Sequence, residues 1–416
     1  MDLLECFFET DIWESVINKG VDKTIPPDIL QKFSRAEERL NLLQKIISGE
    51  YRISPPKVSR VPKDSGGFRE IYVNSPQDRV ILAAINQAYY RLFEARLSPA
   101  CKAYRENSSC GKVVREVASQ KIKGYKLDLS KYFDSVPIDV INKALDELDT
   151  GSPLDSVVRD YYNTDIVLVD GQEVNRFKSL AQGCAIASFL SNYILKDIDK
   201  EMTQMCTYYC RYSDDIVIIA DNPDAVLSRL TEMLSSLQLH LNPAKIERID
   251  SLHEFKFLGF GVTGSKISIS QKDFSLKKRE VKSVCALIGK DRKLTKEEKL
   301  QKLISEVQKI FFCKTNPCHG WLYGKAAFLT DIERVAALDM FCKEHIRAAI
   351  TGRWNFTSNI HKITEQDLRG AGYVSLVHMA KMAKLGRDIY QQEHFLHIEQ
   401  RMPVAAAESV DSFSST

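Results

Sequence analysis

The sequence lacks any long apolar run. Nowhere among its 416 residues do about 18 apolar residues follow one another, so we expect no membrane-spanning helix and no membrane partner. The N-terminal stretch carries acids such as Asp2 and Glu5 where a secretory signal would carry a basic region. These absences together predict a cytoplasmic location.

Cysteine is present without the spacing that gives it a structural role. The ten Cys show no dense regular pattern, which in a chain of this length is typical of a reducing cytosol rather than of a disulfide scaffold. Cys313, Cys318 and His319 resemble half of a zinc site, but no second ligand pair follows at finger spacing. A zinc finger is therefore not expected.

The chain also has little net charge. A formal charge of +3 is a weak indicator of nucleic-acid binding. The segment 271–309, in contrast, holds twelve Lys and Arg against six Asp and Glu. It is either a solvated helical face or a surface that follows phosphates, and for RNA binding we single out four bases near its start: Lys277, Lys278, Arg279 and Lys282.

Two adjacent carboxylates are the main feature that the sequence does have. Asp214 and Asp215 lie between apolar, aromatic-rich runs at 205–211 and 216–220, which predicts a β-hairpin with both acids exposed at its turn. A divalent cation there would compensate the repulsion between like charges. An ordinary Asp-rich turn is the alternative for this dipeptide taken alone.

A third carboxylate stands inside an apolar strand. Asp128 lies inside the run 124–129, where burying an unpaired charge would cost several kcal/mol, so it needs a partner, for which a metal ion is the natural choice. Phe133 follows five residues later and is either a core aromatic or part of a site. Three carboxylates in one antiparallel sheet are what two-metal chemistry requires.

Two further stretches predict contacts to an anionic ligand. The strands 58–62 and 68–73 should form a hairpin, with Lys63 and Arg69 on either side, either gripping a triphosphate or simply solvated. Gln182 and Gly183, followed by small residues, predict a tight loop that a ligand or another backbone can approach closely.

The order of these motifs resembles that of reverse transcriptases. From residue 51 to residue 265, the features follow one another as in that family: Lys63 and Arg69, Asp128 with Phe133, Gln182-Gly183, Tyr212-Ser213-Asp214-Asp215, Lys245, and Phe257-Leu258-Gly259-Phe260. Each is weak alone, and the ordered series is specific. The family's Ser-Pro after Gln-Gly is replaced here by Ala187-Ser188, which departs from the usual template pocket.

The resemblance implies a role for each matching residue. Asp128, Asp214 and Asp215 would hold two Mg²⁺ ions, with Mn²⁺ as a possible substitute. Phe133 would select deoxynucleotides by clashing with a 2′ hydroxyl, and Leu258 with Gly259 would seat the primer end. The remaining residues would bind the incoming nucleotide: Lys63, Arg69, Gln182, Gly183 and Lys245.

It also implies an α+β right-hand polymerase with fingers, a palm made of an antiparallel sheet plus helices, and a helical thumb. The expected divisions are an N-terminal helical extension at 1–50, fingers at 51–120, a palm at 121–265 with a fingers insertion at about 139–180, a thumb at 266–350, and a C-terminal helical region with a flexible tail at 351–416.

Within the family, the chain resembles bacterial enzymes of the group II intron and retron lineage, and most closely the defence-associated reverse transcriptases of the unknown group, type 2. No endonuclease or RNase H block follows, and the retron Asn-Ala-x-x-His signature is absent. The resemblance implies that a structured noncoding RNA is template and scaffold, that dNTPs are substrates and that cDNA is the product. Alternatives left open are a retron-type or intron-derived enzyme, template-independent DNA synthesis, and an RNA-binding maturase-like scaffold.

Overall fold

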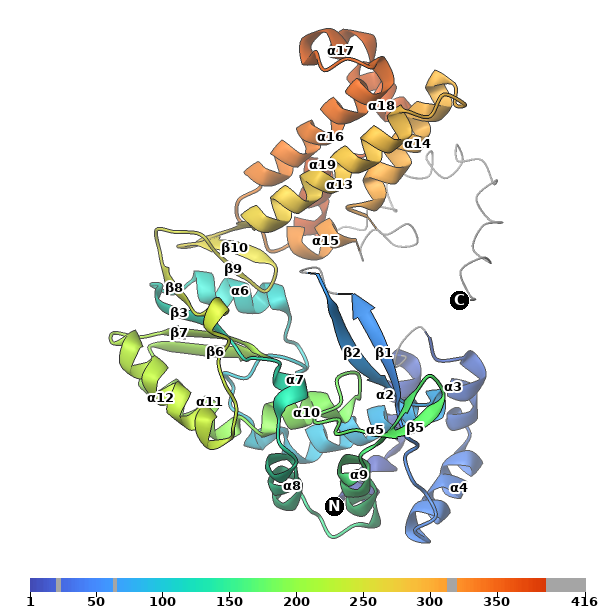
Figure 1. Cartoon of the computed structure of the whole chain (residues 1–416), viewed down its shortest axis with the longest axis vertical. Coiled ribbons are helices and arrows are strands. Elements are labelled where there is room, and N and C mark those ends of the chain that lie inside the picture. Colours follow the sequence, from blue (N-terminus) through green and yellow to red (C-terminus); the bar gives the residue numbers. More distant parts are fainter. Residues whose placement is uncertain (20–23, 63–65, 313–319, 387–416) are drawn as a thin grey trace. The chain divides into compact units, whose positions relative to one another are not determined.

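The computed structural model describes residues 1–19, 24–62, 66–312 and 320–386 (Figure 1). Its contacts divide the chain into two compact units, which we describe separately. The first comprises Met1–Ser109 and Lys123–Ile249, and the second Cys110–Ile122 and Asp250–Thr416. Within the described residues, every helix is too short or too polar to cross a membrane.

Four short helices open the first unit: α1 (Leu3–Phe7), α2 (Thr10–Lys19), α3 (Pro27–Ser34) and α4 (Ala36–Ile47). Asp2 caps α1 through a reciprocal capping box with Glu5. Trp13 is fully buried and stacks on Phe33 with ring centroids 5.3 Å apart. Because α1 and α2 pack on the long helix α5 (Pro76–Phe93), this region contributes to the core of the unit.

One sheet of the first unit has the order β2-β1-β4-β5. Its strands are β1 (Lys57–Pro62), β2 (Phe68–Val73), β4 (Ile166–Val169) and β5 (Gln172–Asn175). The β1–β2 hairpin has the bounds that the sequence predicts, to within a residue, and pairs Val61 with Arg69. The sheet is antiparallel except at β1–β4, where Lys57 pairs with Leu168 in parallel.

The second sheet carries the predicted carboxylates and has the order β6-β7-β3-β8. Its strands are β3 (Lys123–Asp128), β6 (Tyr208–Tyr212), β7 (Asp215–Ile219) and β8 (Glu247–Asp250). Helix α12 (Pro223–Ser236) contacts β3 and β7, and α11 (Lys196–Met205) contacts β6 (Figure 1). Central β7 is buried along Ile216–Ile219, so it is a continuous apolar run instead of an alternating one.

The other elements of the first unit connect these sheets. They are η1 (Glu94–Arg96), α7 (Tyr132–Ser135), α8 (Ile138–Glu147), α9 (Pro153–Asn163), α10 (Ile186–Tyr193) and η2 (Pro243–Lys245). Helix α10 is almost entirely buried and packs on α5, where Phe189 stacks on Tyr89 at 5.3 Å. This buried pair of helices forms the centre of the unit's core.

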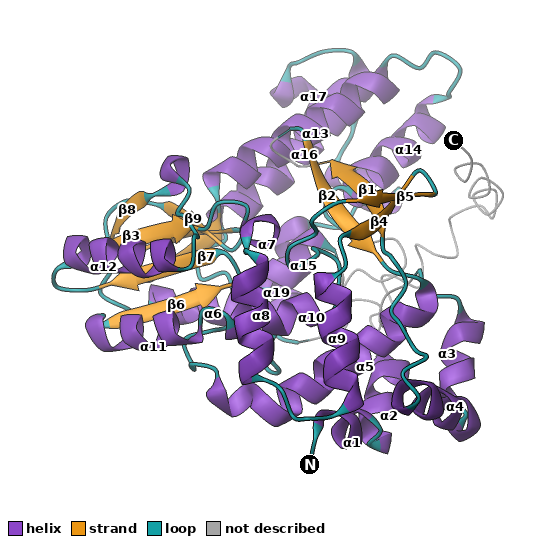
Figure 2. Ribbon diagram, turned by 60° about the horizontal axis from the view of Figure 1, so that its bottom comes forward, coloured by secondary structure: helices purple, strands orange, loops and turns teal. Residues whose placement is uncertain are grey.

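The second unit joins a small sheet to a helical bundle (Figure 2). Strands β9 (Phe255–Phe257), β10 (Phe260–Thr263) and β11 (Lys266–Ile269) form the antiparallel sheet β11-β10-β9, on which α6 (Cys110–Ala118) packs. The remaining helices are α13 (Gln271–Gly289), α14 (Lys296–Lys309), α15 (Trp321–Ala326), α16 (Glu333–Thr351), α17 (Phe356–Lys362), α18 (Glu365–Gly370) and α19 (Leu376–Lys384). Helix α13 packs against both α14 and α16.

The combination of helices with mostly antiparallel sheets is of the expected α+β class. The finer division at residues 50, 120, 265 and 350 stays a prediction. Three groups of sequence-based expectations lie outside the described residues: those for Lys63, for the cluster Cys313, Cys318 and His319, and for the flexible tail.

Candidate active site

The β6–β7 hairpin is closed by a two-residue turn at Ser213 and Asp214. Tyr212 pairs with Asp215 across the turn, and Ser213 adopts a left-handed φ of 61°. Asp214 and Asp215 are half-buried, so the expectation that both are exposed was wrong. The physical reason is that the turn packs against β3 and the loop after it: the Leu129 N–H donates to the Asp214 carbonyl at 2.9 Å.

Asp128 lies directly opposite this hairpin. It pairs with Asp215 in the β3–β7 register, and its residue is only 5% exposed. The sequence predicts that this buried carboxylate needs a partner. The structure supplies Lys245, whose Nζ donates to Asp128 Oδ2 at 2.6 Å from the short helix η2. The three predicted catalytic carboxylates thus lie at one end of a single sheet, and Lys245 of η2 reaches Asp128 there.

The electrostatics of this cluster are those of like charges held together. Burial raises the pKa of Asp214, and the neighbouring Asp128 raises it further. Burial likewise raises the pKa of Asp215 to about 6, with Asp214 adding to the shift and the Lys126 ammonium opposing it. Burial lowers the pKa of Lys245, but its hydrogen bond to Asp128 and the charges of Asp128, Asp214 and Asp215 together outweigh this, and the net shift is upward. Such a site favours an added cation.

A buried ion pair with additional hydrogen bonds, which the sequence did not reveal, supports the β6–β7 hairpin. Arg211 of β6 and Asp199 of α11 both have fully buried side chains and form a double hydrogen bond, Nε to Oδ1 at 2.8 Å and Nη2 to Oδ2 at 2.6 Å. The Arg211 Nη1 also donates to the Ser213 carbonyl at 3.1 Å and to Asn192 Oδ1 at 3.3 Å. This guanidinium therefore fixes the backbone of the turn that presents Asp214.

The surface of the turn has a second support. Tyr104, itself at a left-handed φ of 61°, places its hydroxyl 3.3 Å from the Ser213 Oγ. Its side chain is half exposed (48%), so it is accessible beside the carboxylates. From the sequence, Tyr104 either lines the template path or is a solvated loop residue, and the sequence alone does not decide between the two.

The loop that holds Gln182 and Gly183 has backbone contacts to Phe133 and to β2. The Leu180 N–H donates to the Phe133 carbonyl at 3.2 Å, and the Tyr72 N–H of β2 donates to the Gln182 carbonyl at 2.8 Å. Gly183 has φ 109°, and a Cβ there would lie 2.9 Å from the Tyr72 carbonyl oxygen. The tight loop is therefore real, and its glycine is required by both backbone angle and close approach.

Phe133 and Arg69 differ in how much of each side chain is exposed. Phe133 is half-buried in α7 and packs edge-on against Tyr132 at 5.7 Å, so part of its ring belongs to the core and part faces out. Arg69 is exposed on β2, the strand whose Tyr72 contacts the Gln182 loop. The roles assigned to both residues stay predictions.

In the second unit, Leu258 and Gly259 form the turn between β9 and β10. Phe257 pairs with Phe260, and the two turn residues have left-handed φ of 46° and 81°. This is the geometry of a type I′ hairpin turn, which is costly for leucine. Lys325 of α15 donates to the Gly259 carbonyl and lies 3.4 Å from Asp273, so a side chain not foreseen from the sequence braces the predicted primer-seating turn.

The four bases predicted to bind RNA lie in α13 with different surroundings. Lys277 is ion-paired with Glu280 at 2.8 Å and lies over the Trp321 ring at 5.2 Å. Lys278 lies over the Phe341 ring at 4.5 Å. Arg279 and Lys282 are exposed. Lys277 is thus committed to intramolecular contacts, while the others face outward to different degrees.

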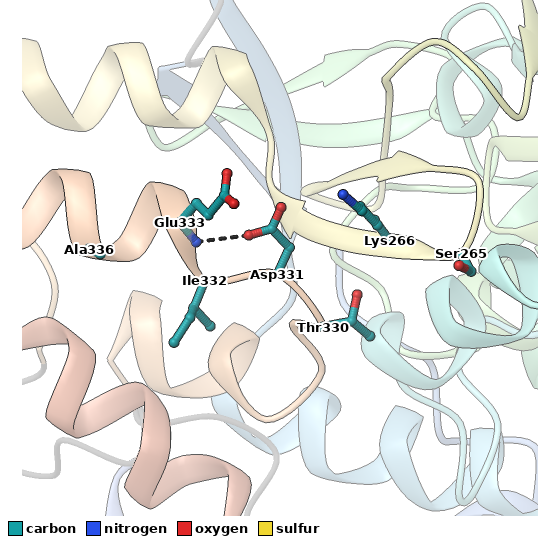
Figure 3. A pocket seen from close by; sticks show the side chains of 7 residues that line it. All are labelled: Ser265, Lys266, Thr330, Asp331, Ile332, Glu333 and Ala336. Carbon is teal, nitrogen blue, oxygen red and sulfur yellow. Dashed lines mark hydrogen bonds between the residues drawn. The ribbon is translucent and has the colours of Figure 1, made fainter.

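A surface hollow of about 740 Å³ also lies in the second unit, at the N-terminal end of α16 (Figure 3). It is lined by Ser265, Lys266, Thr330, Asp331, Ile332, Glu333 and Ala336. Two of its polar groups already serve the backbone, since Asp331 Oδ1 accepts from the Glu333 N–H at 2.8 Å and Thr330 Oγ1 accepts from the Ile267 N–H at 2.8 Å. None of the predicted site residues lines it.

Comparison with known proteins identifies the domain that carries the carboxylates. The family described as reverse transcriptase (RNA-dependent DNA polymerase) matches residues 61–262, just under half of the chain. Residues 61–262 are a reverse transcriptase domain. The α+β right-hand polymerase fold that the sequence predicts is thereby confirmed. The matched segment contains all of the predicted catalytic, nucleotide-binding and primer-seating residues of this reverse transcriptase domain.

Individual relatives are distant. The chain is 22% identical to the putative COX1/OXI3 intron 1 protein of Saccharomyces cerevisiae over 171 residues, which are 40% of this chain but 20% of that protein. It is 23% identical to protein YkfC of Escherichia coli over 291 residues, 58% of this chain and 74% of YkfC. A structure of apo telomerase from Candida tropicalis, truncated from its C-terminal domain, is 12% identical with a TM-score of 0.39, covering 52% of this chain and 56% of that one.

The carboxylate cluster fits a divalent metal ion by its donor chemistry. Asp128 and Asp215 are paired neighbours, Asp214 adjoins them, and each of the last two has a raised pKa in part because of the other carboxylates. Hard oxygen donors that repel one another are suited to Mg²⁺ or Mn²⁺. In the described part of the chain, no three such side chains are already gathered as a metal centre, and Asp128 is directed to Lys245.

Proposed function

We propose that the chain is an RNA-directed DNA polymerase that copies an associated noncoding RNA into cDNA. The observation that carries this is the carboxylate cluster of Asp128, Asp214 and Asp215 at the end of one sheet within the reverse transcriptase domain. The buried Arg211–Asp199 pair supports the proposal, because it holds the turn in the form that presents Asp214.

The residues of the chain have separable tasks in this function. When bound, two divalent cations would lower the pKa of a primer 3′ hydroxyl and stabilise the leaving pyrophosphate, which is the chemistry that a polymerase needs. Phe133 would lie under the incoming sugar and discriminate against a 2′ hydroxyl. Arg69 and Lys63 would bind the triphosphate, because a guanidinium fork and an ammonium suit phosphate oxygens.

Lys245 has a role that its contacts define more closely. Its ammonium neutralises Asp128 in the absence of other cations, at 2.6 Å, and half of its side chain (52%) remains exposed. We infer that it screens the carboxylates while they are free and turns to the nucleotide phosphates during the reaction. Its raised pKa keeps it charged at neutral pH, as both tasks require.

The biological setting is a further part of the proposal. We propose a cytoplasmic bacterial enzyme of antiphage defence, of the unknown-group type 2, with a structured noncoding RNA as template and scaffold. This rests on the sequence resemblance described above. A second candidate is an enzyme or RNA-binding scaffold of an intron, which is favoured by the intron origin named for the yeast relative.

One experiment tests the chemistry and the template together. The protein is purified from cells, and its bound RNA and DNA are sequenced, beside an Asp214→Ala/Asp215→Ala variant and an Asp221→Ala control at an exposed position just beyond β7. We expect one dominant RNA with complementary DNA in the wild type and the control, and RNA alone in the double variant.

The alternatives give other results. DNA unrelated to the bound RNA would indicate untemplated synthesis, and RNA without DNA in all three samples would indicate a scaffold. A co-purified intron would select the second candidate. Retention of complementary DNA by the double variant would contradict the assignment of the carboxylates.

A further inference from the structure

A row of aromatic rings crosses the face formed by α13, α16 and the loop after α16. Phe341 stacks on His345 with ring centroids 3.7 Å apart, and His345 meets Trp354 edge-on at 4.7 Å. The row therefore runs from the half-buried Phe341 through the buried His345 to Trp354, which is 59% exposed. Of the three Trp in the chain, Trp13 is buried and Trp321 is half-buried, so Trp354 is the one whose ring is largely open to solvent.

Two cations border this row. Lys278 Nζ lies 4.5 Å from the centre of the Phe341 ring and 5.3 Å from that of Phe274. Lys282 follows Lys278 by four residues on α13, so the two side chains lie on the same face of that helix. Among the described residues neither lysine forms an ion pair, and the nearby acid Glu280 is already paired with Lys277.

An exposed indole that is supported from behind by packed rings presents a flat apolar face on which a planar ligand can stack. Its apolar face remains in water, while its orientation is fixed by His345. Bases of single-stranded nucleic acid present flat faces that stack on such a ring, and each stacked base contributes about 1–3 kcal/mol. Phosphates on either side of a stacked base would meet unpaired ammonium groups.

We propose that Trp354, backed by His345 and Phe341 and flanked by Lys278 and Lys282, binds unpaired nucleotides of single-stranded nucleic acid. A duplex fits this face less well, because its bases are stacked on one another and offer no free faces. The inference deepens the proposed function, since an RNA template has unpaired stretches, and it assigns their recognition to named residues of the second unit.

Fluorescence quenching can test the site directly. The full-length protein is titrated with a 12-nucleotide oligouridine in EDTA without dNTPs, so that catalysis plays no part. We expect quenching in the wild type and loss of most quenching in Trp354→Leu. The affinities of all variants are measured by the fluorescence anisotropy of a fluorescein-labelled oligouridine, which does not depend on Trp354, and we expect an affinity weakened about 5- to 150-fold in Trp354→Leu. Trp354→Phe should recover most of the affinity, because it restores a ring.

The two lysines have a separate readout. In the double variant Lys278→Gln/Lys282→Gln, the slope of log affinity against log salt should fall by about 1.4, since each phosphate contact to a single strand contributes about 0.7. The matched control is Lys290→Gln. Lys290 is an exposed lysine at the C-terminal end of the same helix, about 12 Å beyond Lys282 along the helix axis. Its slope should equal that of the wild type.

Three results would overturn the inference: wild-type affinity in Trp354→Leu, an unchanged salt slope in the double lysine variant, or a 12-base-pair duplex that quenches Trp354 as strongly as the single strand. Circular dichroism identifies any variant that fails to fold, and the lysine variant then decides. If binding stands while no cDNA is made in cells, the proposed function fails and this site does not. If cDNA is made while Trp354→Leu binds normally, the reverse holds.

Discussion

The buried ion pair between Arg211 and Asp199 leads to a quantitative prediction for Asp199→Asn. The change keeps the size of the side chain but leaves a fully buried guanidinium without its counter-charge. Removing one partner of a buried pair typically costs about 3–5 kcal/mol, because the remaining charge cannot be solvated. The amide oxygen of the variant can still accept from the Tyr209 hydroxyl, as Asp199 Oδ1 does at 2.8 Å. Its amide nitrogen, however, replaces Oδ2 and sets a donor against the Arg211 Nη2 donor, so we expect the upper part of that range.

Urea unfolding measures this loss. Trp13 is buried in the same unit, and its fluorescence reports the unit's transition, with circular dichroism as a second probe. The matched control is Glu232→Gln in the surface pair Arg229–Glu232, where the acid is 72% exposed and the expected loss is below about 1 kcal/mol. Asp199→Asn should also reduce polymerisation, because Arg211 then fixes the Ser213 carbonyl less firmly.

A compensating variant separates the charge effect from general damage. Replacing both partners, as Asp199→Leu with Arg211→Met, removes the unpaired charge and should recover much of the stability. It should not recover polymerisation, because the hydrogen bond to the Ser213 carbonyl is still absent. A loss in Asp199→Asn no larger than that of the surface control would refute the reasoning.

Two further predictions concern the backbone and pH. Gly124→Ala should destabilise the first unit by about 3 kcal/mol or more in urea unfolding, because its Cβ would lie 1.8 Å from the Ile218 carbonyl oxygen in the β3–β7 pair. The control is Gly151→Ala, which lies in open space at φ +76° and should cost about 1 kcal/mol. Equal losses of stability in the two variants would contradict this prediction. Burial lowers the pKa of Lys178 to about 8, below its ordinary value of 10.5. Between pH 8 and pH 10.5 the unfolded chain therefore binds more protons than the folded chain. The free energy of unfolding should rise with pH across this range, by about 3 kcal/mol in all. Lys178→Met should lack this rise relative to the wild type, and parallel pH profiles of the two proteins would show that the lysine is not the source.

Local patterns predicted the strands that carry the site. The hairpins around Asp214 and Arg69 were predictable because alternating or continuous β-type runs flank short polar turns, and that pattern depends only on neighbours in the chain. The burial of Asp128 followed from the same reasoning. The pairing of Asp128 with Lys245 could not be predicted in this way, because Lys245 is 117 residues away and nothing local distinguishes it from a solvated lysine.

Long-range polar pairing accounts for most of what the sequence could not supply. Arg211 and Asp199 are ordinary charged residues in a strand and a helix, and their complete burial emerges only when α11 packs on β6. The exposure of Asp214 was mispredicted for a related reason, since the packing of the turn against Leu129 is a tertiary contact. Lys325, which contacts Gly259 across 66 residues, is a third case.

The interleaving of the two units along the chain has a consequence for synthesis on the ribosome. Helix α6 leaves the ribosome more than 130 residues ahead of β10 and β11, the strands on which it packs. Val113 and Val117 on its apolar face are fully buried in the folded protein. During synthesis this face has no packing partner until most of the first unit and then β10 and β11 have been made. This amphipathic segment of the nascent chain is therefore uncovered for about 7–25 seconds at ordinary elongation rates, a period in which a chaperone has access to it.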